Sequence, residues 1–477
     1  MAAILVHRNV IGSQVILFTA NVTPHFFLQN TDKCLLSGIF IGVFMSAVTI
    51  CTRIHLLVVI LLHGTGVWAQ IGSSTRTDGN GAYSSKQYRN LFLENGHTNQ
   101  EIDEKIAGAF RQLFHGDSAT QRIYFHVGDN ENGPLAYMLD VNNNDIRSEG
   151  MSYGMMIAVQ LDKKSEFDAL WNYAMTYSYI SDPAHPSEGY FAWSLKRDGT
   201  PNSETPAPDG EEYFVTALYF ASARWGDGEG IYDYKAWANK ILTTMRHHPE
   251  KTGQVMNRTQ TVGPMVNEEH KMILFVPNGP AGGGGRAFTD PSYHLPHFYE
   301  LWARWGPEAD RAFWAAAADS SRAYFVKATN PRTGLAPDYG HFDGRPVETR
   351  FNQNSKRFAY DSWRTAMNWS VDWSWWQKDP RQQQLSNRIQ TFFHSQGMDT
   401  YGSVYTLDGE VVNASHGQGL VATNAVASLA ATHDIAKDFV EALWNQPVPD
   451  SFGARYYHGL LHLMSLMHCS GKFRVYE

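Results

Sequence analysis

Cysteine and positive charge are both scarce in this sequence. Its 477 residues include 3 cysteines, and two of these, Cys34 and Cys51, lie in an N-terminal segment that we expect to be removed. Only Cys469 would remain, so no internal disulfide is predicted, and a chain of this length buries a core large enough to do without one. Lys and Arg total 39 against 47 Asp and Glu, and no dense basic run occurs. This balance argues against nucleic acid as a partner.

Metal-ligand patterns are missing as well. His247 and His248 directly precede a proline, and His294 and His297 have no Cys or carboxylate pattern around them. Zinc sites need such side chains at characteristic spacings. The sequence therefore predicts neither a metal nor another cofactor.

The N-terminal segment has the pattern of a secretory signal peptide. Arg53 precedes a short apolar run at 56–62, and Val-Trp-Ala at 67–69 is a suitable cleavage site. A signal anchor at about residues 36–51 is the competing interpretation, although about 20 apolar residues are usually needed to span a bilayer. We expect cleavage after Ala69 and a secreted or periplasmic protein without stable membrane association. The predicted organisation is an N-terminal extension with a signal peptide at 1–69, a flexible leader at 70–85 and one folded domain at 86–477.

Long strands with period-two alternation are scarce, and helical periodicity dominates from about residue 98. Thr98 and Glu101 form a predicted capping box, and apolar residues from Ile102 to Phe114 share one helix face, which ends at Gly116. The best short strand candidates are residues 122–126 and 271–276. Eleven further helical stretches are predicted at about 149–161, 165–180, 211–225, 232–248, 294–305, 308–328, 358–377, 380–396, 418–432, 435–445 and 454–468.

Alternate helices differ in their charge. Helices with little charge, rich in Gly, Ala, Ser and aromatic residues, begin near residues 149, 211, 358, 418 and 454. A helix that is apolar on all sides is buried, whereas the neighbouring helices near 165, 232, 308, 380 and 435 carry a charged face. An inner ring of six helices inside an outer ring of six satisfies this alternation. We therefore predict an all-α fold, an (α/α)6 barrel of about twelve helices in a single catalytic domain.

Three carboxylates lie at junctions that lead into the low-charge helices. They are Glu149, Asp209 and Asp361. Acidic side chains are favourable at the N-terminus of any helix, which is the ordinary structural explanation for each one alone. All three begin helices predicted to be buried, where a desolvated carboxylate needs a partner or a function. We therefore take them as candidate catalytic residues.

The segments that hold these carboxylates resemble glycoside hydrolase family 8. Residues 207–211, Ala-Pro-Asp-Gly-Glu, followed by a helix that closes at Trp225, are similar to one family motif, although Pro208 and Glu211 depart from it. Tyr360-Asp361 with Arg364 matches the family's Tyr-Asp-x-x-Arg segment. Within the family the chain is similar to the reducing-end xylose-releasing exo-oligoxylanases, through residues 289–296, 368–373 and 416–424.

The resemblance implies inverting hydrolysis of β-1,4-xylosidic bonds in xylo-oligosaccharides, with release of xylose from the reducing end. Glu149 is then the general acid and Asp361 the general base, and the two carboxyl groups of an inverting enzyme lie about 6.5–9.5 Å apart to leave room for a water. Asp209 binds hydroxyls of the sugar at the cleavage point. Tyr293 holds the attacking water, with a simple turn aromatic after Asp290-Pro291 as the alternative.

Three further residues are expected to bind substrate. Arg364, one helical turn after Asp361, orients the base or binds a sugar hydroxyl, with a plain ion pair as the alternative. Trp193 is the predicted stacking platform for a sugar ring, with core packing as the alternative. In the exo-oligoxylanases a loop His closes the cleft beyond the leaving-group sugar, and His416 matches it, although Gly417 replaces the expected Pro.

The sequence also allows three other functions. An endo-acting family 8 β-1,4-glycanase on xylan, cellulose or chitosan needs a cleft that is open at both ends. A non-catalytic carbohydrate-binding barrel is a second alternative, and the presence of both Glu149 and Asp361 argues against it. An unrelated barrel enzyme such as a lyase is a third. The sequence makes no prediction of the oligomeric state.

Overall fold

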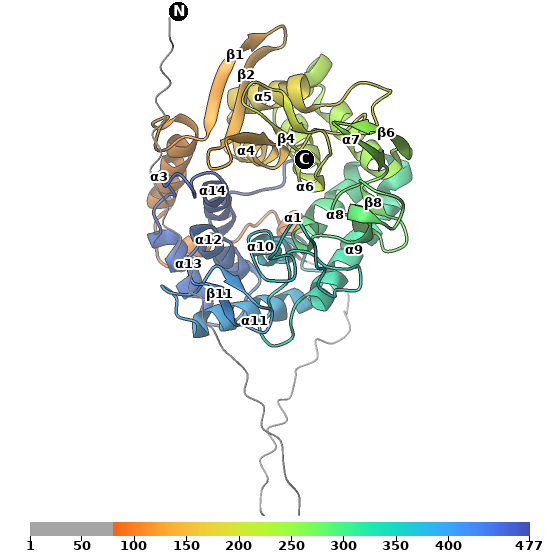
Figure 1. Cartoon of the computed structure of the whole chain (residues 1–477). Coiled ribbons are helices and arrows are strands. Elements are labelled where there is room, and N and C mark those ends of the chain that lie inside the picture. Colours follow the sequence, from red (N-terminus) through yellow and green to blue (C-terminus); the bar gives the residue numbers. More distant parts are fainter. Residues whose placement is uncertain (1–79) are drawn as a thin grey trace, which may run out of the picture. The chain divides into compact units, whose positions relative to one another are not determined.

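A computed structural model describes residues 80–477 of the chain (Figure 1). The predicted N-terminal extension at 1–69, its cleavage site after Ala69 and most of the leader lie outside the described residues. Within residues 80–477, every helix is too short or too polar to span a bilayer.

The described chain folds into two concentric rings of helices (Figure 1). The inner ring consists of α4 (Ser148–Gln160), α6 (Pro208–Trp225), α8 (Pro296–Trp305), α10 (Trp363–Trp376), α12 (Gln418–Val426) and α14 (Tyr457–Cys469). The outer ring consists of α3 (Asn99–Phe110), α5 (Lys164–Tyr173), α7 (Tyr234–His247), α9 (Arg311–Ala328), α11 (Arg381–Ser395) and α13 (Ala436–Asn445). Five outer helices pack on the inner helix that precedes them in the chain, and α3 packs on α14. The predicted (α/α)6 barrel of about twelve helices is confirmed.

The inner helices are buried because their sequences allow close packing on every side. All residues of α14 from Gly459 to Cys469 are buried, Cys469 included. A Cβ on Gly154 of α4 would lie 2.8 Å from the Met138 side chain, so only glycine allows this approach. A hydrogen bond also joins two inner helices where the Trp302 indole of α8 donates to the Thr216 hydroxyl of α6. These contacts hold the ends of the inner helices, which carry the candidate site.

A five-stranded antiparallel sheet precedes and flanks α4. Its order is β1 (Tyr124–Asn130), β2 (Gly133–Asp140), β3 (Asp145–Arg147), β4 (Ser194–Leu195) and β5 (Pro201–Ser203). The predicted strand at 122–126 is confirmed as β1. Strand β2 was not predicted, because residues 135–140 are buried on both faces and a continuous apolar run has no strand period. The sheet fixes the entry into α4, since β3 leads directly into that helix.

Three two-stranded ribbons project from the loops between helices. They pair β6 (Lys251–Val255) with β7 (Arg258–Val262), β8 (Val266–Asn267) with β9 (Met272–Ile273), and β10 (Val404–Tyr405) with β11 (Val411–Asn413). The strand predicted at 271–276 is therefore real but only two residues long. The predicted helix at 358–377 begins later, at Trp363, so Asp361 lies in the turn before α10.

The end of the predicted leader is part of the fold. Short helix α1 (Ala82–Ser85) packs against α10, and helix α2 (Leu91–Glu94) follows it. A Cβ on Gly81 would lie 2.1 Å from the carbonyl oxygen of Trp375, and the Tyr83 ring stacks on Trp376 at 4.3 Å. The prediction of flexibility up to residue 85 is wrong, because these tertiary contacts outweigh a local composition typical of a linker.

Candidate active site

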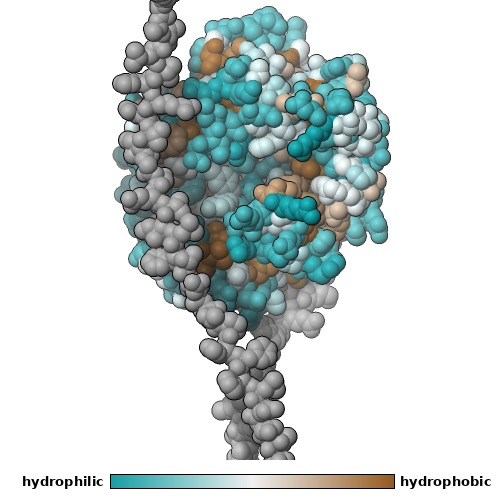
Figure 2. Space-filling view, viewed as in Figure 1, coloured by the Kyte–Doolittle hydropathy of each residue, from teal (hydrophilic) through white to brown (hydrophobic). Residues whose placement is uncertain are grey.

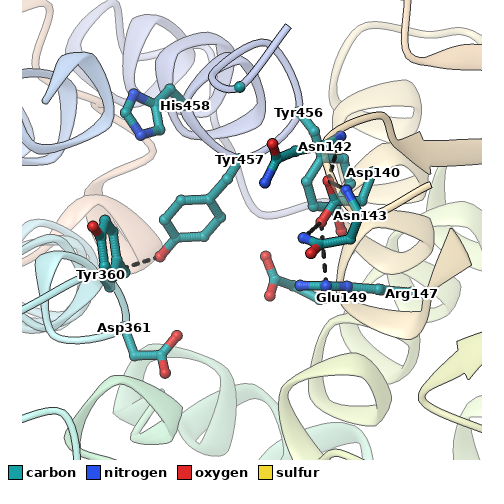
Figure 3. Close-up of a pocket in the computed structure, with 11 residues that line it drawn as sticks. Asp140, Asn142, Asn143, Arg147, Glu149, Tyr360, Asp361, Tyr456, Tyr457 and His458 are labelled. Carbon is teal, nitrogen blue, oxygen red and sulfur yellow. Dashed lines mark hydrogen bonds and ion pairs between the residues drawn. The ribbon is translucent and has the colours of Figure 1, made fainter. Parts of the chain in front are cut away.

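Two neighbouring pockets meet at the predicted acid and base. The first, of about 440 Å³, is lined on one side by Tyr360, Tyr457 and His458 (Figure 3). The second, of about 800 Å³, is lined by residues that include Trp193, Asp209, Tyr293, Phe275, Tyr339 and Phe351. Arg147, Glu149 and Asp361 line both. The two pockets therefore form one cleft with Glu149 and Asp361 at its centre.

Glu149 and Asp361 enter this cleft from opposite sides. Figure 3 shows both carboxyl groups pointing into the first pocket, Glu149 from the first turn of α4 and Asp361 from the turn before α10. The start of α4 is fixed by the Ser148 amide, which donates to the Trp193 carbonyl at 3.0 Å. A Cβ on Gly150 would lie 2.4 Å from the Tyr456 hydroxyl, so the glycine lets α14 approach beside the acid. The two acids, far apart in sequence, thus share one groove.

Glu149 is placed to keep its proton. Its Oε1 is buried and accepts no hydrogen bond. Burial raises its pKa to about 8; Arg364 opposes this shift, and the negative charges of Asp209 and Asp361 add to it. A carboxyl group with this pKa is protonated at neutral pH. Glu149 can therefore donate a proton, as a general acid must.

Arg364 connects the other two carboxylates. Its guanidinium is almost fully buried, and it donates to Asp209 Oδ2 at 3.0 Å and to Asp361 Oδ1 at 3.1 Å. It also donates to the Tyr153 hydroxyl of α4 at 2.6 Å. Burial raises the pKa of Asp209 and Arg364 opposes that shift. Arg364 thus fixes the base relative to Asp209 and compensates the buried negative charge.

Tyr293 and Trp193 lie in the second pocket, as predicted for substrate-binding residues. Tyr293 ends a short 3-10 turn that the Asp290 carboxyl caps by accepting from the Ser292 amide at 2.7 Å. The ring of Tyr293 lies 5.8 Å from the Arg364 guanidinium. Trp193 is half-buried and lies near the guanidinium of Arg147, at 5.5 Å. Both aromatic side chains therefore belong to the cleft.

His416 is the predicted site residue that the structure does not bring to the cleft. It lines neither of the two central pockets and is exposed. Its Nδ1 lies 2.9 Å from the Tyr401 carbonyl oxygen, and its ring packs edge-on against the Tyr401 ring at 4.5 Å. The loop after β11 directs the side chain to Tyr401, which a motif match does not reveal.

Several cleft residues were not singled out from the sequence. Tyr456, Tyr457 and His458 come from the start of α14, and the Tyr457 hydroxyl donates to the Tyr360 carbonyl at 2.8 Å. They lie at the start of a low-charge helix, as the three carboxylates do. Inspection of every such helix start in the sequence would therefore have found them. Phe351 has 68% of its surface exposed and lines the second pocket. The face seen in Figure 2 is otherwise mostly hydrophilic, with hydrophobic side chains in small separate patches.

No group of three or more His, Cys, Asp or Glu side chains within residues 80–477 is arranged to hold a metal ion. The cleft is lined by carboxyl groups, by Arg147 and by aromatic rings. A protonated acid and a second carboxyl group facing one groove, with aromatic walls, are the parts that glycosidic bond hydrolysis needs. Fold and site together are those of a glycoside hydrolase.

The chain belongs to glycosyl hydrolases family 8, whose sequence profile matches residues 137–471. It is 47% identical to the reducing-end xylose-releasing exo-oligoxylanase Rex8A of Paenibacillus barcinonensis, over 83% of this chain and 99% of that relative. It is 43% identical to the reducing-end xylose-releasing exo-oligoxylanase of Halalkalibacterium halodurans, over 83% of this chain and 96% of that protein. A family 8 crystal structure from Teredinibacter turnerae, a xylobiose complex, is 50% identical, with a TM-score of 0.81 over 83% of this chain and 100% of that one.

Proposed function

We propose that this protein is an inverting hydrolase of β-1,4-xylosidic bonds that releases xylose from the reducing end of xylo-oligosaccharides. Family 8 enzymes act with inversion. The observation that carries the proposal is the pairing of Glu149, protonated at neutral pH, with Asp361 at the junction of two pockets. The exo-oligoxylanases named above resemble the chain over nearly their whole length.

The two pockets divide the substrate at the scissile bond. Asp209 and Tyr293 line only the second pocket, so this pocket takes the sugar whose anomeric carbon is attacked. The first pocket then takes the leaving-group sugar. Glu149 protonates the glycosidic oxygen between them, and Asp361 removes a proton from a water that attacks from the opposite face. The bond from the anomeric carbon to the glycosidic oxygen breaks as the bond to the water oxygen forms.

The remaining residues bind the substrate and orient the groups that react with it. Asp209 accepts from hydroxyls of the attacked sugar, and Arg364 holds Asp209 and Asp361 in place. Tyr293 positions the water beside the base. Trp193 offers the face of its indole to a sugar ring in the second pocket.

The pH dependence of kcat/KM tests the role of Glu149. The acid form is the active one, so activity is present below the pKa of about 8 and is lost as pH rises through it. We expect an alkaline limb near this pH in a kcat/KM profile on xylotriose. A profile whose alkaline limb lies in the ordinary carboxyl range instead would remove Glu149 from the role of acid.

Endo-acting hydrolysis of xylan is the second candidate function, and one specific observation favours it. His416, expected to close the cleft beyond the leaving-group sugar, does not line the cleft. A Teredinibacter turnerae structure described as a xylanase bound to xylohexaose is also 50% identical to the chain. An enzyme open at both ends cuts within longer chains.

Product analysis separates these two functions. Xylotriose and xylohexaose carrying ¹⁸O at the reducing-end hydroxyl are digested, and early products are followed by mass spectrometry. Labelled xylose as the main early product is the result expected for reducing-end exo action. A mixture of labelled oligomers would establish endo action instead, and intact substrates would refute both.

Replacement of His416 by alanine is expected to leave the products and the rate nearly unchanged. The side chain is exposed and contacts Tyr401 rather than the cleft, and surface substitutions away from special features usually change stability by no more than about 0.5 kcal/mol. The same labelled substrates provide the measurement. A shift from labelled xylose toward longer labelled products would show that His416 closes the cleft during turnover.

We also propose that the protein is exported, with a signal peptide that ends at Ala69, so that the enzyme meets oligosaccharides outside the cytoplasm. Residues 53–69 contain, in this order, a charged residue, an apolar run and a cleavage site with small residues. This order is typical of a signal peptide and supports the proposal. Expression of the full chain and N-terminal sequencing of the exported protein test it. Gln70 is the expected first residue, and an uncleaved cytoplasmic product would refute it.

A further inference from the structure

A chain of hydrogen bonds runs from α6 to the turn that carries Tyr293. It begins at Glu212, one helical turn after Asp209 on α6 and fully buried. Glu212 Oε1 lies 2.5 Å from the hydroxyl oxygen of Tyr299 on α8. The same Tyr299 oxygen lies 2.9 Å from the carbonyl oxygen of Tyr293. Three elements that are distant in sequence therefore meet at one phenol.

The number of hydrogen atoms available for these two hydrogen bonds is fixed by the groups that form them. A tyrosine hydroxyl carries one hydrogen, a backbone carbonyl oxygen carries none, and a carboxyl group carries one only when it is protonated. Tyr299 can therefore donate to Glu212 or to Tyr293, but not to both. Both contacts are hydrogen bonds only if Glu212 donates its own proton to Tyr299 and Tyr299 donates to the Tyr293 carbonyl.

We propose that Glu212 is a protonated, uncharged carboxyl group that positions Tyr293 through Tyr299. The proposal rests on the proposed function, because Tyr293 matters as the residue that holds the attacking water. Glu212 itself does not touch substrate, since it lies behind the cleft and lines neither central pocket. It is a positioning residue that acts through two others.

The surroundings of Glu212 favour the uncharged form. Its second oxygen, Oε2, is buried and has no hydrogen-bond partner, which is far more costly for a carboxylate than for an acid. Burial raises the pKa of Glu212 well above its usual range, and the charges of Asp209 and Glu211 add to this shift. The charge of Arg364 opposes it, as does the hydrogen bond that Tyr299 would donate to a carboxylate form of Glu212. A charged Glu212 would also repel the Asp209 carboxylate on the same helix.

Other hydrogen bonds hold the same turn, so loss of the Tyr299 contact should displace the turn rather than unfold it. The Asn368 amide of α10 donates to the Ser292 carbonyl at 2.7 Å, and the Asp290 carboxyl caps the turn. Tyr299→Phe would remove the anchor on the Tyr293 carbonyl together with the contact to Glu212. A small displacement of the residue that orients the water would reduce turnover more than it reduces substrate binding.

Infrared difference spectroscopy tests the protonation of Glu212 directly. Spectra of the wild-type protein and of Glu212→Gln are compared at neutral pH, in the carbonyl stretching region of protonated carboxylic acids. A band present in the wild type and absent from the variant is expected. No difference in this region would overturn the proposal, because Glu212 would then be a carboxylate. The measurement needs no substrate, so it stands even if the proposed function fails.

Kinetics on xylotriose tests the positioning role. Tyr299→Phe is expected to lower kcat by about 10- to 100-fold with little change in KM. Glu212→Gln keeps a hydrogen-bond donor toward Tyr299 and is expected to retain most of the wild-type kcat. Tyr219→Phe is the matched control, since Tyr219 is a buried phenol of α6 that donates to Asn239, and neither lines the cleft.

A kcat for Tyr299→Phe no lower than that of Tyr219→Phe would overturn the positioning role. Far-ultraviolet circular dichroism and the Tm of each variant confirm that it is folded. If Tyr299→Phe does not fold, the kcat of Glu212→Gln tests the positioning role, and a kcat far below that of Tyr219→Phe would overturn it. If the wild type does not cut xylotriose at all, the proposed function fails while the infrared result still decides the state of Glu212.

Discussion

Asp361→Asn and Glu149→Gln are each expected to lower kcat on xylotriose by about 10²- to 10⁴-fold, the usual contribution of a positioned acid or base. Asparagine cannot take a proton from the attacking water. Glutamine cannot give one to the glycosidic oxygen. Both replacements keep the size of the side chain, so the cleft at which the two pockets meet should keep its shape. The rate is measured by the appearance of xylose.

Both variants should remain folded. Asp361 has 32% of its side chain exposed, and Glu149→Gln replaces a group that is already uncharged at neutral pH. A Tm close to that of the wild type is the control. Folded variants with wild-type rates would mean that these carboxyl groups do not perform the chemistry, and the assignment of acid and base would be withdrawn.

Arg364→Met is expected to lower the free energy of unfolding by about 3–5 kcal/mol, because it leaves a buried carboxylate without its partner. Asp209 is almost fully buried and accepts from Arg364 at 3.0 Å. Without the guanidinium, the pKa of Asp209 rises further, since burial then acts unopposed. The measurement is urea unfolding at neutral pH, followed by tryptophan fluorescence.

A surface ion pair provides the control for this variant. Arg345 pairs with Asp343 where both side chains are more than half exposed, and Arg345→Met should cost less than about 1 kcal/mol. Equal effects of the two substitutions would contradict the structural role given to Arg364. Arg364→Met should also lose activity even where it remains folded, because Asp361 loses the group that orients it.

The helical part of the fold follows from the sequence because periodicity and charge are both local signals. Each of the twelve predicted stretches overlaps one of the helices α3 to α14, and the five predicted to carry little charge all lie in the inner ring. Strand β2 could not be predicted, because Leu135 to Asp140 are buried on both faces and leave no alternation to detect. The start of the fold at Gly81 depends on contacts with Trp375 and Trp376, which only the tertiary structure supplies.

The three carboxylates of the candidate site were predictable because they sit where inner helices begin. Glu149, Asp209 and Asp361 meet because inner helices begin at one end of the barrel. His416 was placed by likeness to a motif, and its loop turns it toward Tyr401. The role of Glu212 could not be predicted from the sequence, because it depends on the hydroxyl group of Tyr299, 87 positions away.

Proton NMR of xylotriose hydrolysis tests the account most directly. The new reducing end forms on the fragment that occupied the second pocket, and its anomer is read before mutarotation mixes the forms. Attack by a water held at Asp361, while Glu149 protonates the leaving oxygen, gives the α-anomer first. The β-anomer as the first product would mean net retention, which a single displacement across this cleft cannot produce.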